Sequence, residues 1–329
     1  MYTPMRNFLK VLFILIFLIT ALFVRNGLSQ EIYPNKPITM VVAFGPGTID
    51  TMTRTISKIA EKELGQPIII LNKIGAVSTI GVNYVLRSKP DGYTLGAVAT
   101  TYFTLTSHMQ KAPFNVLTDV TDIFPFFKYN QVLCVRADAP WNTYEDLIAY
   151  AKKNPGKFTY ASPGTGYIQH ITMERIAKKE GIKWVPISFK SSGESIAACI
   201  GAHTDGVALS FFETSAHIKA GKLKLLLVLT DSRLKEFPNV PTILEKGYDF
   251  DATSYVAVYG PAGIPESIRQ RLEDVFKNAT TDPSFTKILD QYQLGLPSFR
   301  TGKEYSIFWR SKYDDMGRVV KDLGLAAEQ

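Results

Sequence analysis

Strand-like apolar runs alternate with helical patterns through almost the whole of this 329-residue chain. The first series predicts a strand at 38–44, a helix at 48–64, a strand at 67–71, a helix at 79–87 and a strand at 93–99. The first of these helices carries an apolar stripe and ends before Gly65, a common helix stop. This order of strands and helices implies a parallel sheet with helices on both faces.

A second series begins at Gln131. It predicts strands at 132–136, 158–161, 184–187, 206–210 and 224–229, with helices near 143–153, 167–180, 193–200 and 213–220. A strand at 254–259 and a mostly helical C-terminal part follow. Because no low-complexity linker separates the two series, we expect two α/β lobes joined by more than one crossing, near 131–138 and 249–255.

The crossings define the expected lobes. Residues 31–131 together with 252–329 form the first lobe, which is therefore discontinuous, and residues 132–251 form the second. The chain is long enough for each lobe to have its own core. A cleft between two such lobes is a natural ligand site.

The N-terminus has the features of a secretory signal peptide. Arg6 and Lys10 precede an apolar run at 11–24, which is short for a membrane span. We expect residues 1–30 to be removed and the mature protein to be periplasmic. The alternative is an uncleaved N-terminal anchor.

The charge distribution argues against nucleic acid as a partner, and the cysteine content leaves two alternatives for the thiols. The formal net charge of +7 falls to +4 if the leader, with Arg6, Lys10 and Arg25, is removed, and the remaining excess is scattered. Nucleic-acid binding requires a basic stripe with interleaved aromatic residues, and the sequence has none. The two cysteines, Cys134 and Cys199, are either buried free thiols or a disulfide.

The turn after the first strand is suited to binding a small anion. Gly45 and Gly47 follow Phe44 and leave room for a ligand to approach the backbone. The helix that begins at Thr48 adds unpaired N–H groups and the positive end of its dipole. Asp50 lies in its first turn, where it either orients the loop or meets a ligand that carries an ammonium group.

The same residues partly match the dinucleotide-binding pattern G-x-G-x-x-G. Asp50 stands in place of the third glycine, which normally allows close packing of helix on strand. An extracytoplasmic protein would also lack a supply of soluble nicotinamide cofactor. We therefore expect no cofactor.

Two more strand ends carry groups that could bind a ligand. Ser162, Gly164 and Thr165 lie in a glycine-rich turn before a helix at Tyr167, and Thr100 and Thr101 end another strand. A single loop of this kind is an ordinary connection. A pair of them, one in each lobe, predicts a ligand beyond the carboxyl ends of the strands.

Patterns for catalysis and metal binding are missing from the sequence. His108, His170, His203 and His217 show no zinc-site spacing, and there is no G-x-S-x-G nucleophile turn. We expect His170 to cap or pack in its helix. The sequence thus predicts no catalytic residue, no metal site and no enzyme activity.

Seven strings occur in order along the chain: YPNKPITMVVAFGPGTID (33–50), GQPIIILNKIGAVSTIG (65–81), PDGYTL (90–95), NPGKFTYASPGTG (154–166), HIKAGKL (217–223), PNVPT (238–242) and PAGIP (261–265). Together they resemble the extracytoplasmic substrate-binding proteins of tripartite tricarboxylate transporters, the Bordetella uptake gene (Bug) family. The resemblance spans residues 33–325.

The resemblance implies an α/β protein like the type II periplasmic binding proteins, with two lobes around a ligand cleft. Ligands of this family are mostly small carboxylates, held by backbone amides, hydroxyls and ordered water from two loops. Those loops correspond here to 44–50 and 162–167. The implied protein is a monomer that delivers its ligand to membrane permease subunits and binds no nucleic acid. A periplasmic sensor for a membrane signalling protein is the alternative function.

The chain departs from the family pattern in its first loop and at the end of the strand at 206–210. Where the family often has an Asp-Asn pair, this chain has Leu209 and Ser210, followed by Phe211. We expect a pocket more apolar than usual, and a monocarboxylate or aromatic acid as ligand rather than citrate. The expected ligand-binding residues are Phe44, Gly45, Gly47, Thr48, Asp50, Thr100, Thr101, Ser162, Gly164, Thr165, Tyr167 and Ser210.

Overall fold

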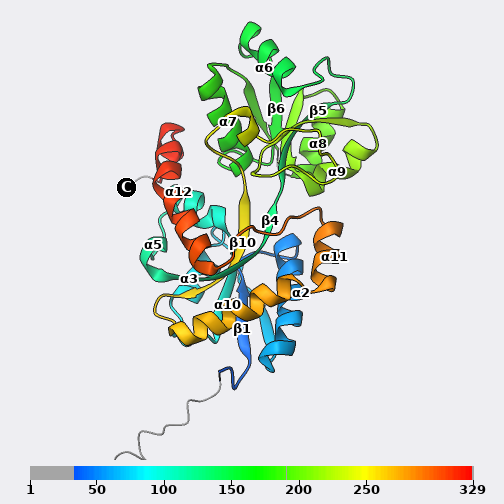
Figure 1. Cartoon of the computed structure of the whole chain (residues 1–329). Coiled ribbons are helices and arrows are strands. Elements are labelled where there is room, and N and C mark those ends of the chain that lie inside the picture. Colours follow the sequence, from blue (N-terminus) through cyan, green and yellow to red (C-terminus); the bar gives the residue numbers. More distant parts are fainter. Residues whose placement is uncertain (1–32, 190, 328–329) are drawn as a thin grey trace, which may run out of the picture. The chain divides into compact units, whose positions relative to one another are not determined.

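The computed structural model describes residues 33–189 and 191–327, so the expected leader at 1–30 lies outside the described residues. From Lys36 onward the chain forms one compact unit. The described residues of this unit build two five-stranded sheets, each flanked by helices (Figure 1).

The first sheet has the strand order β2-β1-β3-β10-β4. Its strands are β1 (Ile38–Val42), β2 (Ile68–Asn72), β3 (Thr94–Ala99), β4 (Val120–Tyr129) and β10 (Ser254–Pro261). The first three are parallel, whereas β10 runs antiparallel to both β3 and β4. Its helices are α2 (Thr48–Leu64), α3 (Thr79–Leu86), the π-helix η1 (Tyr102–Thr106), α4 (Ser107–Met109), α5 (Val116–Asp119), α10 (Glu266–Thr280), α11 (Pro283–Gln291) and α12 (Gly302–Asp322).

The second sheet has the order β7-β6-β8-β5-β9. Its strands are β5 (Gln131–Arg136), β6 (Thr159–Ser162), β7 (Val185–Ser188), β8 (Gly206–Ser210) and β9 (Leu223–Val228). Strands β6, β7 and β8 are parallel, and β5 is antiparallel to β8 and β9. Its helices are α6 (Tyr144–Lys153), α7 (Ile168–Glu180), α8 (Ser192–Ile200), α9 (Phe211–Lys219) and the 3-10 turn η2 (Leu244–Lys246).

Helix α2 begins and ends where the sequence predicts. Met52, Ile56 and Ala60 form its buried face. Gly65 adopts a left-handed φ of 68° and donates its N–H to the carbonyl of Glu61 at 2.9 Å. That bond satisfies one of the last carbonyls of the helix, and glycine has no Cβ to clash in this conformation.

The chain passes from the first sheet to the second through Asn130, the one residue between β4 and β5. This is slightly earlier than the predicted crossing. The return ends at Ser254, which pairs with Tyr129 across β10 and β4. The outgoing and returning segments are also joined by a backbone hydrogen bond, from the N–H of Leu229 to the carbonyl of Gln131 at 2.8 Å.

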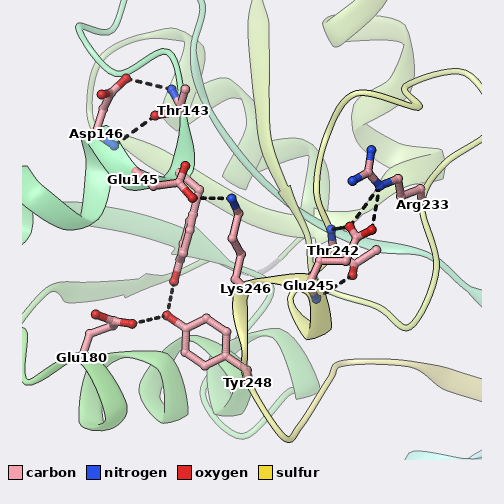
Figure 2. Close-up of polar contacts among 10 residues, drawn as sticks. Thr143, Glu145, Asp146, Glu180, Arg233, Thr242, Glu245, Lys246 and Tyr248 are labelled. Atoms are coloured by element: carbon pink, nitrogen blue, oxygen red, sulfur yellow. Dashed lines mark hydrogen bonds and ion pairs between the residues drawn. The ribbon is translucent and has the colours of Figure 1, made fainter.

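The long segment between β9 and β10 is fixed to the helices of the second sheet (Figure 2). Lys246 pairs with Glu145 of α6. Tyr248 donates its hydroxyl to Glu180 of α7 at 2.7 Å and also meets the hydroxyl of Tyr144 at 2.6 Å. This segment therefore packs with the second sheet before the chain returns to the first.

Strand β4 is the main element that the sequence analysis does not predict. It carries Pro125, and its ladder to β10 is irregular on either side of the paired residues Ala257 and Val258. Proline is normally excluded from central strands but is tolerated at edges and bulges. Because β4 is the edge strand of its sheet, it accommodates the proline.

Both cysteines are buried and unpaired, which agrees with the free-thiol alternative. Within residues 33–189 and 191–327, none of the helices is both long and apolar enough to span a lipid bilayer. The same residues contain no group of three or more His, Cys, Asp or Glu side chains that could hold a metal ion.

Candidate functional site

The loop after β1 leads from Phe44 into α2 without steric strain. Gly47 is the N-cap residue and has an extended backbone, with φ at 163°. A Cβ built on Gly47 would meet nothing closer than the Gly45 carbonyl oxygen at 4.0 Å. The space above this backbone is open, as the sequence analysis expects for a ligand that approaches amide groups.

Asp50 acts as a clamp in this loop. Arg54 donates to its carboxylate from Nε at 2.8 Å and from Nη2 at 3.1 Å, and Asn72 donates from Nδ2 at 2.7 Å. The same Asn72 amide reaches the Phe44 carbonyl at 2.9 Å. Hydrogen bonding from Arg54 lowers the pKa of Asp50, so the carboxylate is ionised. Of the two roles expected for Asp50, this arrangement matches the orientation of the loop.

The glycine-rich turn after β6 is held by its neighbours at several points. The carbonyl of Ser162 accepts the N–H of Phe189 at 3.1 Å, and the hydroxyls of Thr165 and Ser188 lie 3.2 Å apart. Gly164 has φ at 150°, a conformation that L side chains rarely adopt. At the end of the turn, the Tyr167 side chain is 56% exposed.

His170 supports this turn from the first helical turn of α7. Its Nδ1 accepts the N–H of Gly166 at 3.3 Å, and the side chain is buried. Burial lowers the pKa of His170 and so favours the neutral ring that can accept this bond. His170 therefore packs in its helix and also accepts a backbone N–H of the preceding turn, in line with the expectation that it caps or packs.

The hydroxyl of Thr100 is committed to the fold. It donates to the Tyr255 carbonyl at 2.9 Å and lies 3.0 Å from the hydroxyl of Tyr305. Thr101 lies 3.4 Å from the hydroxyl of Ser254, in the return segment. Thr100 and Thr101 line a cavity of about 50 Å³ together with Ile168 of α7 and residues of α12.

Helices α7 and α12 close this cavity along a seam that joins the two sheets. Arg175 pairs with Asp315 at 3.0 Å, and Lys178 pairs with Asp322 at 2.9 Å. Beside these ion pairs lies a buried apolar cluster that contains Ile171 of α7 and Leu105, Met316 and Val320 from the first-sheet side. A cavity of this size holds one or two water molecules and is too small for a metabolite.

Tyr129 connects the first loop to the end of β8. Burial raises the pKa of Tyr129 well above the usual value, the nearby Glu213 carboxylate raises it further, and an interaction with the Thr48 side chain lowers it. Glu213 in turn accepts the hydroxyl of Ser210 at 2.7 Å. Thr48 of the first loop and Glu213, which holds Ser210, therefore both lie near the half-buried Tyr129.

A larger groove of about 810 Å³ lies beside Asn130, where the chain passes from the first sheet to the second. It is lined by Lys128, by residues that follow β9, and by α11 with the loop after it. None of the expected ligand-binding residues lines this groove. The candidate site therefore rests on the polar groups of the loops and not on this groove.

The sequence does not predict a role in the site for several polar residues that lie near the loops. Asn72 holds the first loop, and Tyr129 lies near Thr48 of that loop and Glu213 of α9. Gln169 of α7 donates from Nε2 to the Oε1 of Gln131 at 2.9 Å, and both side chains are buried. In the sequence, the only sign of this amide pair is that Gln131 begins the strand β5 and Gln169 lies in the first turn of α7, at the same end of the sheet.

Comparison with known proteins identifies the relatives of this chain. A family model described as "Tripartite tricarboxylate transporter family receptor" matches residues 52–325. A UPF0065 protein from Cupriavidus necator is 34% identical over 301 residues, which is 90% of each chain. Another UPF0065 protein, from Bordetella pertussis, is 31% identical and covers 93% of this chain and 95% of its own.

Solved structures share the same fold. A TctC solute-binding protein from Polaromonas has a TM-score of 0.81 and 27% identity, covering 88% of this chain and 99% of its own. An R. palustris protein solved with adipate and the R. palustris MatC with bound malate are each 22% identical, with TM-scores of 0.72 and 0.68. They cover 89% and 88% of this chain, and 99% and 100% of their own.

These matches confirm the predicted α/β fold with two lobes, and they confirm the resemblance seen in the sequence. The Polaromonas relative is described as a TctC solute-binding protein, a further structure at 27% identity is described as a periplasmic transporter, and the matching model describes a receptor. The chain belongs to the tripartite tricarboxylate transporter receptor family, which includes the Bug proteins.

Proposed function

We propose that this protein is a periplasmic receptor that captures a small carboxylate between its two lobes and delivers it to a tripartite tricarboxylate-type membrane transporter. One observation carries the proposal. The loops after β1 and β6 each combine glycines with the N-terminus of a long helix, and neither loop contains a lysine, arginine or histidine. Backbone amides and helix dipoles are then the available partners for an anion.

The proposed binding loops are 44–50 and 162–167, with Thr101 and Ser210 beside them. Main-chain N–H groups of Gly47 and Gly164 would contact the carboxylate, and Thr48 and Thr165 would add hydroxyls. Carboxylate ligands in two structures of the same fold, adipate and malate, support this class of ligand. The apolar side chain of Phe44 favours a monocarboxylate or aromatic acid over citrate.

The proposed lobes are 31–131 with 252–329, and 132–251, and they move about Asn130 and the return segment. The cavity beside Thr101 has room only for water, so a metabolite requires the α7–α12 seam to separate. Ligand binding that favours the closed form would then drive closure. The closed form is the species that a permease would recognise.

The proposed protein is a monomeric receptor without catalysis, exported by cleavage of the leader at 1–30. Calorimetry with a panel of carboxylates would test the receptor role. Saturable binding of a carboxylate that is recovered unchanged is the expected result. A bound compound that is converted to a product would contradict it.

The variant Gly47→Val tests the position of the site. The extended backbone and the open space at Gly47 accept a valine, so we expect the melting temperature to stay within about 2 °C of the parent value. The isopropyl group would block approach to the amides, and affinity should fall at least about 100-fold. Gly47→Ala serves as the graded control, with an intermediate loss. Unchanged affinity in Gly47→Val would remove the first loop from the site.

A further inference from the structure

Two buried polar atoms, one at the end of β6 and one at the start of α7, have no hydrogen-bond partner among the described residues. They are Oγ of Ser162 and Oε1 of Gln169. Ser162 is fully buried, and Gln169 is 7% exposed. Buried polar atoms are nearly always paired in native proteins, with protein, water or ligand, because an unpaired one loses its hydration without compensation.

Both residues stand at the end of one face of the second sheet, and we call the polar side chains there the polar patch. Ser162 follows Tyr160 by two residues in β6, and Gln131 precedes Leu133 by two in β5. Side chains two apart in a strand share a face. Tyr160 and Leu133 both belong to the core that α7 covers. Ser162 and Gln131 therefore lie at the end of that face, where Gln169 enters from the first turn of α7.

The neighbouring groups in this patch are already used. The Gln169 amide donates to Gln131 Oε1 at 2.9 Å, which fixes its orientation and leaves its own oxygen as a free acceptor. The hydroxyl of Ser210, which pairs with Gln131 across β8 and β5, is taken by Glu213. What remains is one acceptor, Gln169 Oε1, and one hydroxyl, Ser162 Oγ, that can both donate and accept.

The chemistry of these two atoms calls for a neutral group that donates one hydrogen bond and accepts another. A hydroxyl does both. An ammonium group also donates, but it would stand at the positive end of the α7 dipole, which disfavours a cation. A plain methylene would leave both protein atoms unpaired.

We propose that Gln169, held by Gln131, is a specificity-determining residue that selects carboxylates bearing a hydroxyl next to the carboxyl group. The proposal rests on the proposed function, since it places the carboxylate on the loop 162–167. The ligand hydroxyl donates to Gln169 Oε1 and accepts from Ser162 Oγ. An acid without this hydroxyl binds the same loop but leaves both atoms without a partner.

The test compares acids that differ only by the hydroxyl. Titration calorimetry on the full mature protein uses three pairs: mandelate with phenylacetate, lactate with propionate, and malate with succinate. For any pair that binds, we expect the hydroxy acid to bind at least about tenfold more tightly, because a site built to hydrogen-bond a hydroxyl rejects the analogue that lacks it. This comparison uses the unmodified protein and does not depend on the folding of a variant.

Substitutions then assign the preference to Gln169. In Gln169→Leu the hydroxy acid should lose about tenfold in affinity while the deoxy acid is unchanged, and Ser162→Ala should act in the same direction. Gln270→Leu, at an exposed position of α10, is the matched control and should keep the preference. Equal loss for both acids in Gln169→Leu would indicate a structural role and overturn the proposal.

The binding experiments separate the preference for a hydroxyl from the binding of carboxylates in general. Equal binding of hydroxy and deoxy acids by the unmodified protein would overturn the inference and leave a carboxylate receptor. If no pair binds, mass spectrometry of the ligand released from the purified protein decides the question. A released hydroxy acid supports the inference, a carboxylate without the hydroxyl overturns it, and a compound without a carboxyl group overturns both.

Discussion

At the scale of single residues, Asp50 shows how a carboxylate can hold the shape of the loop that we propose as an anion-binding loop. Its charge is neutralised by Arg54, and Asn72 couples it to the Phe44 carbonyl. The loop amides are thereby oriented while the negative charge is turned toward a cation of the same helix. The sequence identifies Asp50 as important but cannot choose between its two roles, because Asn72 is 22 residues away.

The neutral ring of His170 predicts a pH-dependent stability. Its pKa in the folded protein lies below the ordinary value of about 6.5. The unfolded chain therefore binds more protons, and this contribution to stability is complete above about pH 6.5 and declines as the pH falls through the folded pKa. In His170→Gln, melting temperatures measured from pH 7 to pH 5 should fall less steeply than in the parent.

The same substitution at His203, which is exposed, is the matched control and should leave the slope unchanged. A parallel course of the parent and His170→Gln curves would contradict the assignment. Because protonation turns the acceptor Nδ1 into a donor, the bond from Gly166 is lost in the same pH range.

At the scale of elements, the α7–α12 seam joins the two sheets through both ion pairs and apolar contacts. Ile171 is fully buried in its apolar cluster. Ile171→Ala should reduce the free energy of unfolding by about 2–4 kcal/mol, since it leaves a cavity in packed surroundings. Chemical denaturation measures this loss. Ile307→Ala, at a position of α12 that is 63% exposed, should change stability by less than about 0.5 kcal/mol. Similar losses in both variants would indicate that the seam is not packed.

The elements also show how far sequence patterns reach. Helix α2 and strand β8 occur at the predicted residues, because an apolar stripe with a glycine stop and a bounded apolar run are local signals. Pro125 argues against a strand at the position of β4. The strand forms nevertheless, because it lies at the edge of its sheet, where proline is tolerated. The direction of β10, antiparallel to its neighbours, depends on how the chain comes back from the second sheet. Local sequence patterns do not predict that path.

The sequence predicts some features of the candidate site and not others. Glycine-rich turns before helices are visible in the sequence, so the loops 44–50 and 162–167 could be predicted. The Gln131–Gln169 pair joins residues 38 apart and depends on two elements meeting at one sheet edge. Contacts of this kind follow from the tertiary fold, and the sequence offers only glutamines at the starts of a strand and a helix.

At the scale of the whole molecule, an ion pair between a buried lysine and a partly buried aspartate ties the two sheets together. Lys128 of β4 pairs with Asp231, which follows β9 and also accepts the hydroxyl of Tyr255 at 2.9 Å. Burial alone would raise the pKa of Asp231, but the Lys128 charge and these hydrogen bonds lower it below the usual value. The carboxylate is therefore ionised at neutral pH.

Lys128→Met should destabilise the protein by about 3 kcal/mol at pH 7, because it leaves the Asp231 charge without its partner. Asp231 with a lowered folded pKa stabilises the parent above the unfolded pKa of about 3.9, and this contribution is lost as the pH falls through the folded pKa. The difference between parent and variant, measured by urea denaturation, should therefore shrink at acidic pH.

Lys58→Met removes a cation from an exposed ion pair with Glu61 and serves as the control, with an expected change below about 0.5 kcal/mol. A loss in Lys128→Met that is equally small would mean that the Lys128–Asp231 pair contributes no more than a surface pair.

The pairing of Tyr129 with Ser254 has a consequence for engineering. The chain leaves the first sheet and re-enters it on adjacent antiparallel strands, at directly opposed residues. A two-residue reverse turn such as Asn-Gly could splice these ends into an ordinary hairpin. Everything between them is topologically an insert, so a miniaturised scaffold without it should retain the first sheet uninterrupted.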